Sequence, residues 1–218
     1  MSEQLTKLLK DSKGMRWTAL FLVAFTMLSA YFFVDMIAPL QSLLENSYKW
    51  SPSTYGIFSG SEYMLNVLGF LILSGIILDK MGIRFTGITS AAVMVIGGLI
   101  KCYGLTPYFY QGGFGYGLFE SIGNAIGLPP TALVAAIGYA IFGVGVEMCG
   151  ITVSKAIVKW FKGKEMALAM GMEMATARLG ASFAFAFSPM IAGVSGAGNE
   201  VTGNPLNSVY FGLALLSI

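Results

Sequence analysis

The chain contains no histidine among its 218 residues. This absence excludes Ser-His and Cys-His nucleophilic catalysis, zinc sites built on histidine and an axial haem histidine. Cysteine is almost as rare, because only Cys102 and Cys149 occur, each within or at the end of an apolar run. Two such cysteines provide neither a disulfide framework nor a metal cluster, and they are typical of small core residues. We therefore expect no metal, no cofactor and no enzymatic activity.

Charged residues are also scarce, at 11% of the chain against 56% hydrophobic residues. This balance predicts a polytopic membrane protein with an all-α helical bundle, surrounded by membrane lipid and without a nucleic-acid partner. A crossing needs about 20 apolar residues, so the length allows about six spans. We expect a cytoplasmic tail at residues 1–16 and a transmembrane bundle at 17–218. The expected spans are residues 17–42, 54–78, 85–104, 131–160, 166–193 and 207–218.

The last expected span is shorter than a full crossing requires, which predicts that the chain is a portion of a larger protein. Lysine and arginine lie mainly at alternate ends of the spans, and the positive-inside rule then places the N-terminus in the cytoplasm. The chain also lacks an Asn-x-Ser/Thr acceptor for glycosylation. The missing acceptor favours a bacterial cell (inner) membrane over an animal lysosome.

Two apolar runs flank the basic turn WFKGKE at residues 160–165, and each run carries one notable charge. Glu147 lies about as far before Gly163 as Arg178 lies after it, so an antiparallel hairpin places both at similar depth. A charge in the hydrocarbon costs roughly 2.5–3.5 kcal/mol, and it is tolerated when it faces the bundle interior, a partner or a water-filled cavity. The two charges therefore predict either a clamp for a zwitterion or a buried ion pair that fixes helix packing.

The first three spans carry further polar residues. Asp35, near Tyr31, is either an acid at the membrane interface or a residue of a cavity, and Tyr63 is a further cavity candidate. We expect Glu62 to be solvated near the outer surface and Lys101 to reach the outer interface by snorkelling.

Glycine is abundant, and its placement predicts where helices approach one another. Close contact is expected along Gly56, Gly60 and Gly69 in the second span. In the fourth and fifth spans, either close packing or an open cavity is expected at the small residues Gly138, Gly143, Gly145, Gly150, Gly171, Ala175 and Gly180. The glycine-rich and aromatic connection at residues 104–130 is expected to be an outer loop with an interfacial aromatic belt.

The short inner loop GIILDKMGIR, residues 75–84, combines two glycines with three charged residues. Gly75 and Gly82 allow close backbone approach and a sharp turn. Asp79 can meet a helix N-terminus or a cation of a neighbouring helix, while Lys80 and Arg84 hold the turn at the headgroups.

This loop resembles the signature between the second and third helices of the major facilitator superfamily. The resemblance implies the N-terminal six-helix half of a transporter, with a C-terminal six-helix half missing from the chain. It also implies that Asp79 belongs to a latch between the two halves and that Arg84 is its supporting charge.

Four further strings are similar to the lysosomal dipeptide uniporter branch of that superfamily and its bacterial relatives. They are YFFVDMIAPLQ at 31–41, FGVGVE at 142–147, WFKGKE at 160–165 and ARLG at 177–180. The resemblance implies that Glu147 binds the amino group of a dipeptide and Arg178 its carboxylate. Two positions depart from the pattern: Tyr139 stands where many proton-coupled members have arginine, and Glu62 has no matching acid.

The expected function is transport of a small zwitterionic solute, a dipeptide above all, by alternating access. Tyr31, Asp35 and Tyr63 are further cavity candidates in this half. Two alternatives remain open. One is a carrier of the organic-anion or nitrate type, in which Arg178 holds the anion and Glu147 orients it. The other is a membrane scaffold in which all charged pairs are structural.

Overall fold

A computed structural model describes residues 12–196 and 201–218. Most of the expected tail at 1–16, and part of the connection between the fifth and sixth expected spans, lie outside these residues. The described chain folds into α2 (Lys13–Asp35), η1 (Ala38–Leu40), α3 (Gln41–Tyr48), α4 (Pro52–Leu65), the π-helical η2 (Asn66–Phe70), α5 (Leu71–Leu105), α6 (Pro107–Tyr110), α7 (Tyr116–Ile126), α8 (Pro130–Phe161), α9 (Met166–Ile191) and α10 (Pro205–Leu216).

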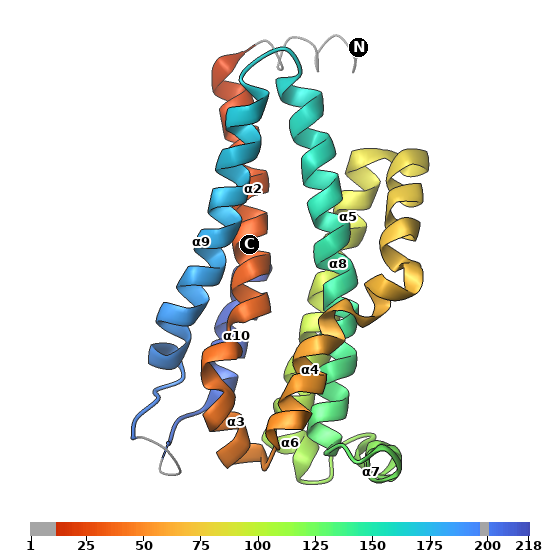
Figure 1. Ribbon diagram of the computed structural model, residues 1–218, viewed down its shortest axis with the longest axis vertical. Coiled ribbons are helices and arrows are strands. Elements are labelled where there is room, and N and C mark those ends of the chain that lie inside the picture. The colour runs from red at the N-terminus through yellow and green to blue at the C-terminus, as the bar shows by residue number, and fades with distance from the viewer. Residues whose placement is uncertain (1–11, 197–200) are drawn as a thin grey trace.

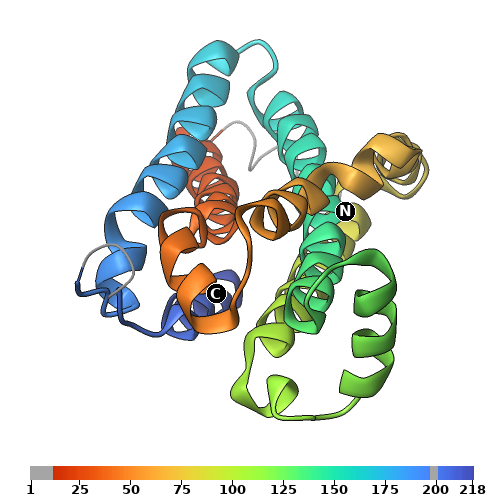
Figure 2. The same ribbon diagram turned by 60° about the horizontal axis from the view of Figure 1, so that its bottom comes forward.

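The long helices form an elongated bundle with two groups (Figure 1). Helices α2 and α9 lie side by side in one group, and α4, α5 and α8 form the other, with α10 against α2 and α5. The turn from α8 to α9 and the start of α2 lie at the same end, which we call the basic end because it carries Arg16, Lys159, Lys162 and Lys164. The short helices α3, α6 and α7 lie at the opposite end (Figure 2).

Three helical stretches of the described chain are long and apolar enough to cross a membrane, namely 13–48, 52–105 and 130–161. The middle stretch reverses direction inside α5, where Gly82 has φ 81° and ψ 173°. The expectation of an all-α, multi-pass membrane bundle is thereby confirmed.

Glycine brings the backbones of α5 and α8 into direct contact. A Cβ atom on Gly138 would strike the backbone of Lys101, and one on Gly97 would strike the backbone of Phe142. Gly145 meets Met94 and Ser90 of α5 in the same way. Larger side chains would push the two helices apart, so this interface depends on small residues.

Two other helix–helix contacts also depend on a glycine that lies against the backbone of the neighbouring helix. Gly180 of α9 lies against the backbone of Leu28 in α2, and Gly143 of α8 lies against the backbone of Glu62 in α4. The expected contact face on the second span is wrong, because the Cα positions of Gly56 and Gly60 look into open space. Packing on α8 is decided by the glycines of α8 itself.

The second span is broken at Gly69, whose φ of 109° is available to glycine but strained for other residues. The surrounding η2 turn is a π-helix, a form that interrupts the regular backbone ladder. Around the break the chain turns away from α8 (Figure 1), and Val67, Leu68 and Ile72 are 72–84% exposed. This half of the span therefore presents its apolar side chains to the surroundings of the bundle.

The first span also ends earlier than expected, because α2 stops at Asp35 and a 3-10 turn containing Pro39 leads into α3. The connection at 104–130 is not a plain loop, since it contains α6 and α7. Side chains bind this end together: Tyr48 donates to the Leu105 carbonyl at 2.7 Å, and Trp50 Nε1 donates to Thr131 Oγ1 at 3.0 Å.

Candidate functional site

The two opposite charges predicted to form a clamp lie at matching distances from the α8–α9 turn. At about 1.5 Å per residue, Glu147 is about 21 Å from Phe161 along α8, and Arg178 is about 18 Å from Met166 along α9. Both helices are regular over this distance, so the two residues stand well inside the bundle rather than at either end.

Glu147 and Arg178 form no salt bridge with each other, although both belong to the described chain. Instead the guanidinium of Arg178 lies over the ring of Tyr31, with 5.4 Å from its Cζ to the ring centroid. Arg178 is exposed and Glu147 is partly exposed. The alternative of a buried ion pair between these two residues is therefore wrong, and both charges are available to another group.

The remaining predicted cavity residues lie in the same neighbourhood. Tyr31 interacts electrostatically with Arg178 and Glu147, and Asp35 interacts with Arg178. Tyr63, whose side chain is 53% exposed, interacts with Asp35, Glu147 and Tyr31. Electrostatic interactions thus connect the five predicted residues, which belong to α2, α4, α8 and α9.

Next to this group lie buried polar residues whose surroundings we predicted incorrectly from the sequence. Lys101 does not snorkel: its exposed fraction is 0%, and its ammonium lies 3.9 Å from the ring centroid of Tyr139 and 4.6 Å from that of Phe33. Glu62 is not solvated either, since it is 5% exposed and its Oε2 lies 3.1 Å from Tyr139 Oη, within hydrogen-bond distance. We call Lys101, Tyr139 and Glu62 the buried polar cluster.

A sequence signal for the position of Lys101 did exist. Gly97, Lys101 and Gly104 are spaced by four and three residues, so they share one face of a helix. Both glycines are in contact with α8. A lysine between two packed glycines is on the protein side of its helix, where its ammonium has no path to the interface.

The inner-loop motif shows one of its expected features clearly. Asp79 accepts a 2.7 Å hydrogen bond from Lys155 of α8, so its partner is a cation of a neighbouring helix. Gly82 provides the turn, whereas a Cβ on Gly75 would meet open space, so the close approach expected there is wrong. Lys80 and Arg84 are exposed.

The Asp79–Lys155 pair supports a quantitative expectation. Its side chains are 80% and 42% exposed, and exposed pairs contribute about 0.2–1 kcal/mol. Asp79→Lys should therefore lower the unfolding temperature only slightly, and the double variant Asp79→Lys/Lys155→Asp should restore it. Thermal unfolding in detergent at low and high salt checks this, and a large loss that the exchange does not repair would contradict it.

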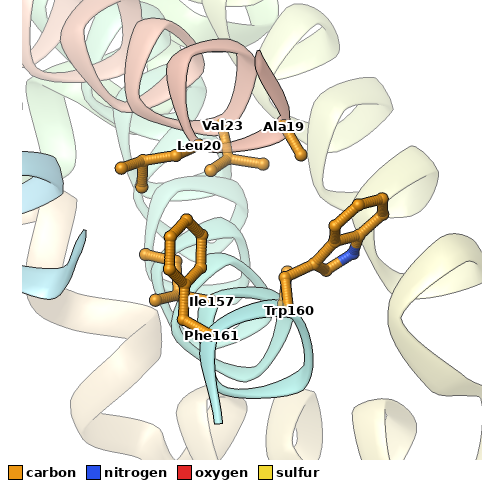
Figure 3. A pocket seen from close by; sticks show the side chains of 7 residues that line it. Ala19, Leu20, Val23, Ile157, Trp160 and Phe161 are labelled. Carbon is orange, nitrogen blue, oxygen red and sulfur yellow. The ribbon is translucent and has the colours of Figure 1, made fainter. Parts of the chain in front are cut away.

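At the basic end, α2 and α8 are held together by apolar packing. Ala19, Leu20 and Val23 of α2 face Ile157, Trp160 and Phe161 of α8 across a cavity of only about 30 Å³ (Figure 3). Arg16 adds a 3.5 Å contact to Glu165 and lies over the ring of Phe161. Helices α2 and α8 therefore pack directly against each other at that end.

Comparison with known proteins adds a distant relationship. The chain is 26% identical over 168 residues to the "Lysosomal dipeptide transporter MFSD1" of Mus musculus, and this match covers 77% of the chain and 31% of the relative. The Homo sapiens protein of the same name is 26% identical over 168 residues, with the same coverage of both chains. The Bos taurus protein is 25% identical over 194 residues, covering 86% of the chain and 36% of the relative.

No protein-family model and no solved structure matches the chain. The chain spans about a third of the length of the curated relatives that it matches. Those relatives are named as transporters, which agrees with the expectation that the chain is not an enzyme.

Proposed function

Because the chain is a distant relative of transporters of the major facilitator superfamily, we propose that it is the N-terminal half of a carrier that moves dipeptides across a membrane by alternating access. In this proposal Glu147 binds the amino group and Arg178 the carboxylate. Tyr31, Asp35 and Tyr63 line the same cavity. The second half of the carrier is a C-terminal six-helix bundle that encloses the site from the other side.

The observation that carries the proposal is that Glu147 and Arg178 stand at similar depth on successive helices and do not neutralise each other. Two unpaired charges of opposite sign inside a membrane protein are costly. A zwitterionic ligand supplies a partner to each of them, which recovers part of the desolvation cost. A ligand with one charge leaves the other protein charge without a partner.

Tyr31 holds the guanidinium of Arg178 through a cation–π contact. A cation over an aromatic ring gains about 0.5–2 kcal/mol, and the planar guanidinium keeps its edge N–H groups free for a carboxylate. With its Cζ 5.4 Å from the ring centroid, Arg178 can still offer these N–H groups to a bidentate contact. This support is provided by α2, the helix packed directly on α9.

The gating role belongs to the loop at residues 75–84, with Gly75, Asp79, Lys80, Gly82 and Arg84. We place the basic end in the cytoplasm, because the positive-inside rule favours that orientation. The membrane in question is the cell (inner) membrane of a bacterium. The Asp79–Lys155 pair then stands at the cytoplasmic side, where the two halves of the carrier meet.

Competition between capped and free dipeptides tests the proposal. In proteoliposomes that contain the full-length protein, uptake of a labelled dipeptide should be inhibited by free dialanine. N-acetyl-dialanine, without the amino charge, and dialanine amide, without the carboxylate, should each inhibit at least about tenfold less, since a lost charged hydrogen bond is worth about 1.5–3 kcal/mol.

The other outcomes separate the alternatives. Equal inhibition by simple carboxylates and by free dipeptides would identify an anion carrier. A protein with neither uptake nor a ligand-induced rise in its unfolding temperature is a scaffold, because any ligand that binds only the folded state must stabilise it.

A further inference from the structure

In the buried polar cluster, the hydroxyl group of Tyr139 contacts two oxygen atoms and cannot donate its one proton to both. Tyr139 Oη lies 2.9 Å from the carbonyl oxygen of Val34 and 3.1 Å from Oε2 of Glu62. A phenol has one proton to donate, and an ionised carboxylate, like a carbonyl, only accepts. If Glu62 is ionised, one of the two contacts therefore has no proton, in a place where Glu62 is 5% and Tyr139 4% exposed.

A proton on Glu62 removes the conflict. The carboxylic acid then donates to Tyr139 Oη, while Tyr139 donates to the Val34 carbonyl, so each contact has its own proton. Buried polar groups are almost always satisfied in this way, because an unsatisfied one costs about 1–3 kcal/mol. The arrangement of three oxygens therefore fits the protonated form of Glu62.

Four groups face Glu62 from the helices packed around α4. Tyr139 and Glu147 come from α8, Lys101 comes from α5 and Asp35 comes from α2. The positive charge of Lys101 favours the ionised form of Glu62. The carboxylates of Asp35 and Glu147 favour its protonated form. Lys101 does not form a salt bridge with Glu62 in this described region, because its ammonium is directed at the ring of Tyr139 and the carbonyl of Phe33.

Glu147 links this cluster to the site proposed above, because it lies one helical turn beyond Gly143 on α8, and the Cβ position of Gly143 meets Glu62. An amino group bound to Glu147 cancels part of the negative charge near Glu62. A positive ligand and a proton then compete electrostatically, and linkage requires that each weakens the binding of the other. Glu62 thus responds to occupation of the site without touching the ligand.

From these contacts we propose that Glu62 is a protonation site whose proton is released as the amino group of a substrate binds at Glu147. This inference rests on the proposed function for the identity of the substrate. The step is a proton transfer: the O–H bond of the Glu62 acid breaks, and the proton leaves to water, with Glu62 left as a carboxylate. Tyr139 then turns its hydroxyl proton from the Val34 carbonyl to Glu62.

This exchange of hydrogen bonds has a structural consequence. Val34 belongs to α2, next to Asp35 and one turn from Tyr31. While Glu62 is protonated, Tyr139 ties the end of α2 to α8, and this tie is lost when the carboxylate forms. Glu62 and Tyr139 therefore act as positioning residues for the helix that supports Arg178.

Infrared spectroscopy on the full-length protein in lipid nanodiscs tests the proton site without any substrate. The difference spectrum between acidic and alkaline buffer should contain the carbonyl band of a buried carboxylic acid. Glu62→Gln should remove this band, and Tyr139→Phe, which keeps the ring under Lys101, should shift it. Glu173→Gln is the matched control, since it removes another buried acid, 8% exposed on α9, and should leave the Tyr139-sensitive band in place. Identical spectra for the wild type and Glu62→Gln would overturn the proposal.

Calorimetry of dialanine binding in buffers with different ionisation enthalpies tests the link to substrate. The wild type should release up to about one proton per dipeptide, and Glu62→Gln should release almost none while it still binds. Equal proton release by both proteins would overturn the linkage. A wild type that binds no dipeptide would instead refute the proposed function, and the infrared result would still decide whether Glu62 carries a proton.

Discussion

Uptake of dialanine by an Arg178→Lys variant is expected to fall at least about tenfold, while the variant folds normally. Lysine keeps the charge but lacks the planar fork that binds both carboxylate oxygens. It also loses the flat contact with the ring of Tyr31, where the guanidinium Cζ lies 5.4 Å from the centroid. The loss of a charged hydrogen bond, about 1.5–3 kcal/mol, sets the size of the effect.

Initial uptake rates over a range of dialanine concentrations measure this change. Lys162→Arg is a suitable control, because it makes the reverse exchange at an exposed residue just after α8 and should leave uptake unaltered. The unfolding temperatures of both variants should match that of the wild type. Normal transport by Arg178→Lys would show that the carboxylate is not held in a bidentate grip, and the clamp would have to be abandoned.

The second large effect concerns stability and arises at the contact of α5 with α8. Gly138→Ala should destabilise the folded protein by about 1–3 kcal/mol or more, because the added methyl group meets the backbone of Lys101 and neither helix can yield without moving the other. Separation of the two helices would also widen the enclosure around Lys101.

Gly171→Ala in α9 provides the matched comparison. A Cβ there meets nothing within 4 Å, and alanine is the better helix former by about 0.5–1 kcal/mol. Thermal unfolding of the two variants in the same detergent should therefore shift in opposite directions or, at the least, by very different amounts. Similar shifts for both would mean that the α5–α8 contact is not limited by backbone approach.

The positions of the long helices could be predicted from the sequence because hydrocarbon thickness imposes a length on apolar runs. The fourth and fifth expected spans, 131–160 and 166–193, nearly coincide with α8 and α9. The break at Gly69 could not be predicted in this way, because an isolated glycine in an apolar run is compatible with a straight helix. Only the backbone angles distinguish the two cases.

The clamp candidates were accessible to sequence reasoning because both charges interrupt apolar runs at a measurable distance from a turn. Lys101 and Glu62 were misplaced for the opposite reason: each lies near the end of its run, where a charge is ordinarily solvated. What buries them is the packing of aromatic rings from α2, α4 and α8, namely Phe33, Phe58 and Tyr139. Spacing along α5 indicates that Lys101 shares a face with Gly97 and Gly104, but the rings that enclose it come from distant segments, which that spacing does not identify.

The enclosure of Lys101 also affects how the polypeptide is assembled in the membrane. When the helix that carries Lys101 first leaves the ribosome and enters the bilayer, α8 has not yet been synthesised, and the ring of Tyr139 is missing from around the ammonium. Without that ring, a lysine near the end of its apolar run extends its ammonium to the lipid headgroups. The buried position of Lys101 is therefore complete only when α8 has joined the bundle. The burial of Lys101 in α5 thus depends on a helix that is synthesised later.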